Sequence, residues 1–163
     1  MIRIGHGYDV HSFTEGSALR LGGVDVPFSK RFAAHSDGDV LIHALCDALL
    51  GALALGDIGS WFPDTDPAHA GRDSAEFLNL IMLDIREKGY DLGNADITVI
   101  AQAPKLRPYI DTMCERVAEI VGVSRSQISI KATTTEGLGP MGRGEGVAVH
   151  AVVILQTSEM ATA

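Results

Sequence analysis

The segment from Asp39 to Leu55 has apolar residues on almost every side of the helix that its spacing predicts. These residues are Val40, Leu41, Ala44, Leu45, Ala48, Leu49, Ala52 and Leu53. A helix that is apolar around most of its circumference has to be buried on most of its sides. The rest of the chain must therefore surround it. Ser36 or Asp37 is expected to cap its first turn.

Strands and further helices alternate along the remainder of the chain. Strand patterns cover 2–11, 92–101, 127–135 and 147–155, a hairpin is expected at 19–21 and 24–26, and helical spacing covers 74–88 and 108–121. Because strands and helices interleave with short connections, we predict an α+β fold in which one sheet carries helices on one face. A chain of 163 residues buries roughly 69% of its unfolded surface. We therefore predict one domain over residues 1–157, followed by a flexible tail at 158–163.

The charge excludes some classes of partner. The formal net charge is −8, from 21 acids against 13 lysines and arginines, so bulk charge does not favour nucleic acid or an anionic membrane. No apolar run reaches the ~18 residues of a membrane span, and the first residues read as a strand rather than a signal peptide. Two cysteines are too few for a disulfide framework. We expect a cytoplasmic protein of mature length.

The first polar motif lies in the first strand, Gly5-His6-Gly7-Tyr8-Asp9-Val10-His11. Residues two apart in a strand share a face, so Asp9 and His11 point the same way, and Gly5 and Gly7 are expected to leave open space beside them. Imidazole and carboxylate donors suit zinc. The alternative is a surface Asp–His pair at a strand end.

A polar stripe on the buried helix strengthens the metal hypothesis. Asp39, His43 and Asp47 are spaced four residues apart and fall on one face. Such a stripe is costly to bury unless it is paired or metal-bound, which makes His43 a natural third ligand and Asp47 the carboxylate that orients it. An acidic helix start that complements the dipole would explain Asp39 but not His43 beside Asp47.

Three further segments carry polar groups suited to a ligand. The loop 57–67 holds Asp57, Asp64 and Asp66, which could bind polyol hydroxyls or simply form a solvated turn. Residues 101–105 end in Lys105 before a helix and suit a nucleobase edge or a phosphate. The run 131–146 combines threonines, glycines and Glu136, which could cradle phosphates and hold magnesium, although threonines are also ordinary strand residues.

The charges of these segments differ. Residues 33–73 contain seven acids and one arginine, whereas residues 101–145 contain six lysines and arginines against five acids. The two segments therefore suggest two sides of one site, brought together within one subunit or at an interface between subunits.

Together these segments resemble the 2-C-methyl-D-erythritol 2,4-cyclodiphosphate synthase family of the non-mevalonate isoprenoid pathway. The matching stretches are GHGYDVH, HSDGDVLIHALCDALLGALALGDIG, FPDTDP, KGYDLGNADITVIAQAPK and KATTTEGLG followed by GRGEG. The resemblance implies a lyase that cyclises 4-diphosphocytidyl-2-C-methyl-D-erythritol 2-phosphate and releases CMP. It also implies a homotrimer with active sites at the subunit interfaces.

The resemblance further implies a role for individual residues. Asp9, His11 and His43 would bind zinc, Glu136 would bind magnesium or manganese, and His35 and Thr134 would stabilise the transition state. Substrate contacts would come from Ser36, Asp57, Ile58, Gly59, Phe62, Pro63, Asp64, Thr65, Asp66, Ala101, Gln102, Ala103, Pro104, Lys105, Leu106, Arg107, Thr133, Thr135 and Arg143.

One segment departs from the family pattern. Many relatives carry an aromatic residue shortly before the arginine, where this chain reads Gly139-Pro140-Met141-Gly142. In the family this region lines a cavity on the threefold axis that can hold an isoprenoid diphosphate, so Pro140 and Met141 change its lining. Two other functions stay open at this stage: a trimeric module that binds nucleotides or isoprenoid diphosphates without catalysis, and a metal-dependent phosphatase.

Overall fold

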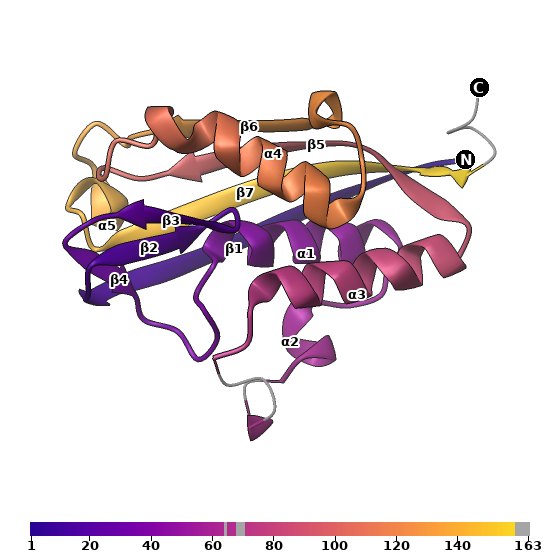
Figure 1. Cartoon of the computed structure of the whole chain (residues 1–163), viewed down its shortest axis with the longest axis horizontal. Helices are drawn as coiled ribbons and strands as arrows, with labels where there is room; N and C mark the ends of the chain where they lie inside the picture. The colour runs from indigo at the N-terminus through magenta and orange to yellow at the C-terminus, as the bar shows by residue number, and fades with distance from the viewer. Residues whose placement is uncertain (64, 68–70, 159–163) are drawn as a thin grey trace.

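A five-stranded mixed sheet forms the frame of the molecule (Figure 1). The computed structural model of the chain describes residues 1–63, 65–67 and 71–158. The strands lie in the order β4 (Lys30–Phe32), β1 (Ile2–Glu15), β7 (Gly146–Thr157), β5 (Tyr90–Ile100) and β6 (Ile128–Thr133). All neighbours are antiparallel except β5 and β6, which pair in parallel.

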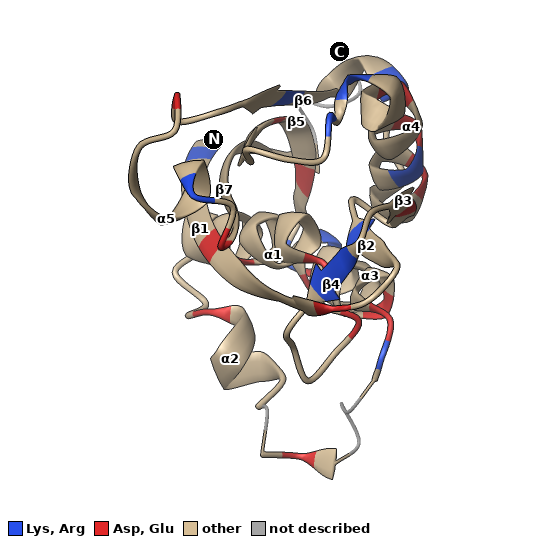
Figure 2. Cartoon of the chain, turned by 90° about the vertical axis from the view of Figure 1, so that its left-hand side faces the viewer, with Lys and Arg blue, Asp and Glu red and all other residues tan. Residues whose placement is uncertain are grey.

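The longer helices pack on one side of this sheet. They are α1 (Val40–Ala52), α3 (Ser74–Glu87) and α4 (Ile110–Val121), and Figure 2 shows the sheet curving around α1. Shorter helical segments are α2 (Ile58–Trp61), α5 (Gly139–Gly142), η2 (Arg107–Tyr109) and η3 (Arg125–Gln127). This arrangement confirms the predicted α+β class with helices on one side of a sheet.

The prediction of a single sheet was incomplete. The hairpin β2 (Ala18–Leu21) and β3 (Val24–Pro27) forms a separate two-stranded sheet, and β4 was not predicted. Only Phe32 is buried among the three residues of β4. A strand of this length is too short to show the alternation that identifies longer strands, so the sequence did not predict it.

Helix α1 is as buried as its sequence requires. Ten of its thirteen residues are buried. Its cap is Asp39, whose side chain accepts a hydrogen bond from the backbone N–H of Ile42. The expectation that Ser36 or Asp37 caps this helix was therefore wrong. Asp39 is fully buried and also accepts from the N–H groups of Gly22 and Gly23, so it ties the helix start to the hairpin turn.

Two glycines of β1 let α1 lie directly on the sheet. A Cβ atom at Gly5 would come within 1.8 Å of the Ala48 carbonyl oxygen, and one at Gly7 within 1.9 Å of the Ala44 carbonyl oxygen. The expectation that Gly5 and Gly7 leave open space was wrong, because the backbone of α1 fills it. This close approach brings the first turns of α1 to the polar end of β1.

Among the described residues, no helix is both long enough and apolar enough to cross a bilayer. Cys46 and Cys114 are buried and free, as the cysteine count predicted. The predicted tail falls at 158–163, of which residues 159–163 lie outside the described part of the chain.

A candidate metal centre and two pockets

Asp9, His11 and His43 come together at the junction of β1 and α1. The Oδ2 atom of Asp9 lies 3.0 Å from Nε2 of His11 and 3.3 Å from Nδ1 of His43. One ligand atom from each side chain lies within 4.8 Å of the other two, which is close enough for one metal ion. All three residues are half-buried. Alternation along β1 presents the first two, and the glycine contacts bring His43 to them.

Hydrogen bonds outside this cluster determine where the imidazole protons lie. Nδ1 of His11 is 2.9 Å from the carbonyl oxygen of Gly38, which can only accept, so this nitrogen carries the proton and Nε2 presents a lone pair. Nε2 of His43 is 2.9 Å from Oγ of Ser74, and the Ser74 hydroxyl donates to the carboxylate of Asp37. His43 therefore donates from Nε2 and leaves a lone pair on Nδ1.

Two imidazole lone pairs and a carboxylate thus converge on one point. Such groups repel one another unless a positive charge lies between them, supplied by a metal ion or by a proton on one ring. Nitrogen and oxygen donors of this kind fit zinc, and three protein ligands leave a fourth position for a substrate. The donor set therefore fits the metal that the sequence predicted.

The pKa shifts of Asp9 and His11 also indicate that the cluster stabilises positive charge. Burial alone would raise the pKa of Asp9, but hydrogen bonds and charges from His11 and His43 outweigh it and hold the pKa well below its usual range. Burial alone would lower the pKa of His11, yet the bond to Asp9 and its charge raise the pKa above the ordinary value. The cluster favours a cation at its centre.

Asp47 has a different partner from the one predicted. Its Oδ1 accepts a hydrogen bond of 2.8 Å from the backbone N–H of Ile58 at the start of α2. The hydroxyls of Ser74 and, at 3.3 Å, of Ser36 contact Nε2 of His43 instead. We predicted no role for Ser74, which begins α3 and reads in the sequence as an ordinary helix-start serine.

The first pocket, a cavity of about 420 Å³, opens beside the metal cluster. Among the predicted site residues it is lined by Asp9, His11, His35, Ser36, His43, Asp47, Ile58, Gly59, Phe62, Thr65 and Asp66. Asp57 and Pro63 do not line it, and Asp57 caps α2 through a hydrogen bond from the Ser60 N–H. Asp64 lies outside the described residues.

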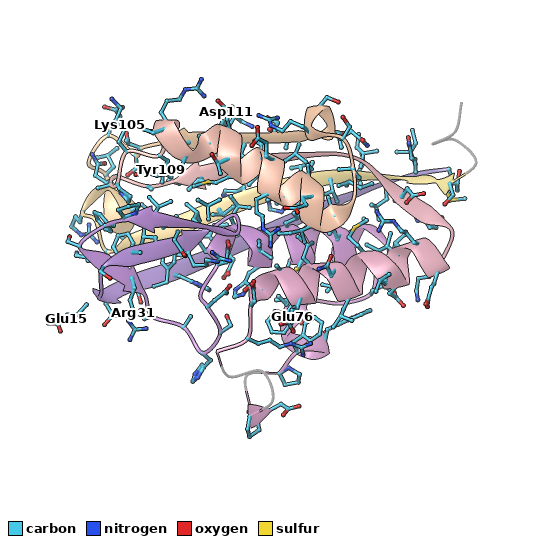
Figure 3. All side chains as sticks on the ribbon, in the orientation of Figure 1. Glu15, Arg31, Glu76, Lys105, Tyr109 and Asp111 are labelled. Carbon is cyan, nitrogen blue, oxygen red and sulfur yellow. The ribbon has the colours of Figure 1, made fainter. Side chains whose placement is uncertain are left out.

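The second pocket, about 650 Å³, lies at the ends of β5 and β6. Its predicted members are Ala101, Gln102, Pro104, Lys105, Leu106, Arg107, Thr133, Thr134 and Glu136. Ala103, Thr135 and Arg143 do not line it; the Arg143 Nε atom pairs with Glu145 at 2.6 Å. In Figure 3, Lys105 lies at the upper left of the molecule, whereas Glu76 of α3 lies in its lower half.

Among the residues that the structure describes, the two pockets have no lining residue in common. Strand β7 separates β1, which carries metal-cluster residues, from β5, which leads to the second pocket. For the described part of the chain, the structure therefore does not bring the two predicted halves of the site into one cavity.

Comparison with known proteins identifies the class to which this α+β fold and its candidate metal centre belong. The model of the YgbB family matches residues 2–156. A 2-C-methyl-D-erythritol 2,4-cyclodiphosphate synthase of Ectopseudomonas mendocina is 60% identical over 154 residues, which cover 94% of this chain and 98% of that protein.

Solved structures agree with this match. A Plasmodium falciparum IspF in complex with CDP has a TM-score of 0.84 and 38% identity over 96% of both chains. The bifunctional IspDF of Campylobacter jejuni has a TM-score of 0.93 and 45% identity; the match covers 96% of this chain but 42% of that longer protein.

The chain belongs to the YgbB family. This is the family of the 2-C-methyl-D-erythritol 2,4-cyclodiphosphate synthases, and the chain is an enzyme of their lyase class.

Proposed function

We propose that the chain cyclises 4-diphosphocytidyl-2-C-methyl-D-erythritol 2-phosphate to 2-C-methyl-D-erythritol 2,4-cyclodiphosphate and releases CMP. The observation that carries this proposal is the cluster of Asp9, His11 and His43 in a pocket that His35 and Ser36 also line. The CDP bound by the Plasmodium falciparum relative supports a CDP-linked substrate.

Two metal ions fit the proposal. Asp9, His11 and His43 would hold zinc, and Glu136 would hold magnesium or manganese. When bound, the metals would supply positive charge that polarises and neutralises phosphate oxygens. Glu136 has a φ of 53°, in the left-handed region, where a residue with a Cβ costs about 1–2 kcal/mol. A glutamate at such a position supports a functional role for its carboxylate.

Little acid–base chemistry is required of the protein. The nucleophile is the substrate's own 2-phosphate, which is already anionic near neutral pH because its second pKa is about 6. It attacks the β-phosphorus, a new P–O bond forms, and the bond to CMP breaks with CMP leaving as an anion. Both groups belong to one substrate molecule, so the step is intramolecular, and the protein's contribution is to hold them in line at the distance from which attack occurs.

The chain's residues would divide the substrate among them. His35 and Ser36 would bind the attacking phosphate, with His35 and Thr134 stabilising the transition state. The first pocket would hold the methylerythritol through Ile58, Gly59, Phe62, Thr65 and Asp66, together with Asp57, Pro63 and Asp64. The second pocket would hold cytidine through Ala101, Gln102, Pro104, Lys105, Leu106 and Arg107, together with the neighbouring Ala103, and Thr133, Thr135 and Arg143 would lie near the diphosphate.

We further propose a homotrimer in which each active site joins the first pocket of one subunit to the second pocket of a neighbour. The separation of the pockets supports this arrangement. So does the sheet face opposite the helices, which exposes Ile4, Tyr8, Val10 and Val152, 42–69% each. An isoprenoid diphosphate could occupy the central cavity of the trimer. The cytoplasmic location stays a prediction.

Product analysis by phosphorus NMR tests the proposed function. Protein incubated with the CDP-linked substrate, zinc and magnesium should yield the cyclic diphosphate and CMP. Release of inorganic phosphate would instead indicate a phosphatase, and unchanged substrate that stays bound would indicate a binding module. Either result would overturn the synthase proposal.

A further inference from the structure

A buried chain of hydrogen bonds runs behind His43, away from the metal cluster. Nε2 of His43 lies 2.9 Å from Oγ of Ser74, and the Ser74 hydroxyl donates to Oδ1 of Asp37. Ser74 is fully buried. The three side chains thus form an imidazole–hydroxyl–carboxylate series built from α1, the start of α3 and the loop before α1.

The Ser74 hydroxyl is not needed to begin α3. Asp73 caps this helix through the N–H of Ala75, at 2.9 Å, and the backbone N–H of Ser74 itself reaches Oδ2 of Asp37 at 3.0 Å. Among the hydrogen bonds of the described residues, the hydroxyl serves only to join Asp37 to His43. Its burial is therefore explained by the imidazole that it contacts.

Asp37 is itself fixed from several directions. Its Oδ1 accepts from the N–H of Asp39 at 3.2 Å, and Nε of Arg20 lies 3.9 Å from its Oδ2. Its backbone N–H donates to the Arg72 carbonyl oxygen at 3.3 Å. These contacts hold the carboxylate in place beside Ser74, so the series has a fixed end.

We propose that Ser74 and Asp37 are positioning residues for the metal ligand His43. The Ser74 Oγ atom accepts a hydrogen bond from the Nε2–H group of His43, and Asp37 orients the Ser74 hydroxyl. Together they fix the ring with its Nδ1 lone pair directed at the metal position. A hydrogen-bonded partner also makes the ligand nitrogen more basic, and losing such a partner typically weakens metal binding. The inference rests on the metal site of the proposed function.

The positioning series also connects the metal site to the segment that carries His35. The N–H of Gly71 donates to the His35 carbonyl oxygen at 2.8 Å, next to the bond from Asp37 to the Arg72 carbonyl. The segment 35–37 and the segment 71–74 are therefore tied together. The backbone bond to His35 therefore lies close along the chain to the contacts of Ser74 with Asp37 and His43.

Metal titration of the apoprotein tests the inference without relying on turnover. Zinc affinity is measured by competition with a chromophoric chelator for wild type, Ser74→Ala and Asp37→Asn. Cobalt absorption spectra report the geometry of the ligands. The matched control is Ser124→Ala, which also removes a serine hydroxyl at the start of a helical segment, η3, and Ser124 lines neither pocket.

We expect Ser74→Ala to bind zinc about 10- to 100-fold more weakly and to shift the cobalt bands, while the control does neither. A variant that carries both Ser74→Ala and Asp37→Asn should lose no more zinc affinity than Ser74→Ala alone, because Asp37 acts through Ser74. Circular dichroism and melting of the apoproteins show which variants are folded. If Ser74→Ala does not fold, Asp37→Asn alone should still weaken zinc binding.

Three outcomes would overturn the inference. Unchanged zinc affinity and cobalt spectra in folded Ser74→Ala, or in Asp37→Asn where the first does not fold, would show that the series does not position His43. Fully additive losses would show that Asp37 acts independently of Ser74. Wild-type protein that binds neither metal would remove the metal site of the proposed function as well, which distinguishes that failure from the others.

Discussion

The two pockets differ in how completely one chain builds them. In the first, Asp9, His11 and His43 are half-buried, and both imidazoles are held by hydrogen bonds that they donate to the surrounding backbone and side chains. In the second, Lys105, Thr133, Thr134 and Glu136 are exposed. The comparison teaches that a candidate metal centre can be preformed within one chain while the residues around the pocket at β5 and β6 stay exposed.

The largest expected effect is the loss of a metal ligand from the first pocket. In His43→Ala or Asp9→Ala, we expect loss of bound zinc and of nearly all turnover while the fold survives, because two ligands are too few for tight binding. Metal content per chain and product formation are the measurements.

The control is His150→Ala, which removes an exposed histidine of β7 and should keep its zinc. Full zinc occupancy with near-native rates in both ligand variants would show that the preformed centre lies elsewhere.

The next effect concerns the contact that builds the first pocket. Gly7→Ala places a Cβ atom against the Ala44 carbonyl oxygen, and we expect it to destabilise the fold by about 1–3 kcal/mol or more, as overpacking does. Urea unfolding measures the loss, and zinc affinity should fall with it.

Gly51→Ala in α1 is the matched control, since its nearest contact would be 3.9 Å from the His6 carbonyl oxygen. Alanine favours helix over glycine by about 1 kcal/mol, so this variant should be as stable as wild type or more so. Equal destabilisation of both variants would contradict the close-approach argument.

A third effect is the pH dependence of metal binding in the first pocket. Protons and metal compete for His11, whose pKa is raised above its ordinary value of about 6.5. Zinc affinity should therefore be full at higher pH and should fall as pH drops through this raised pKa, by about tenfold per pH unit for each proton displaced. Chelator competition between pH 8 and pH 6 (about one unit either side of neutrality) measures it. A zinc affinity that stays constant over this pH range would contradict the competition between protons and zinc for His11.

The smallest effect tests the second pocket. Glu136→Gly should relieve the left-handed backbone and stabilise the chain by up to about 1 kcal/mol, while lowering magnesium-dependent turnover. Denaturant unfolding and product formation are measured together.

Ala54→Gly is the control, because Ala54 has a φ of 56° and lines neither pocket. It should gain similar stability and keep its turnover. Unchanged turnover in Glu136→Gly would remove Glu136 from the proposed chemistry.

Sequence patterns predicted the fold class and most elements because hydrophobic periodicity reports directly which faces are buried. They predicted the candidate ligands because strand and helix spacing places Asp9 with His11 and His43 at a buried face. They did not predict β4, nor the separate sheet of the hairpin, since three residues carry too little periodicity and strand pairing is decided by tertiary contacts.

The sequence was less informative about which polar groups meet. Asp47 and His43 share a helix face, but Asp47 accepts a hydrogen bond from the backbone N–H of Ile58. The imidazole of His43 is contacted instead by Ser74, which lies 31 residues along the chain. Spacing within one helix cannot reveal a partner from another element. Gly7 shows the same limit, because a missing side chain can mean either open space or a backbone in close contact.

Strand β4 has a consequence for how the chain avoids harmful association. An unpaired sheet edge invites extra strands from other molecules, and short or lysine-bearing edges discourage them. The terminal strand β4 is only Lys30–Phe32, pairs with residues 13–15 of β1 and exposes Lys30 and Arg31, and the terminal strand at the other side, β6, carries the exposed Lys131. Addition of further strands to β4 or β6 is thus disfavoured, and this would leave the face of the sheet for the association that we propose.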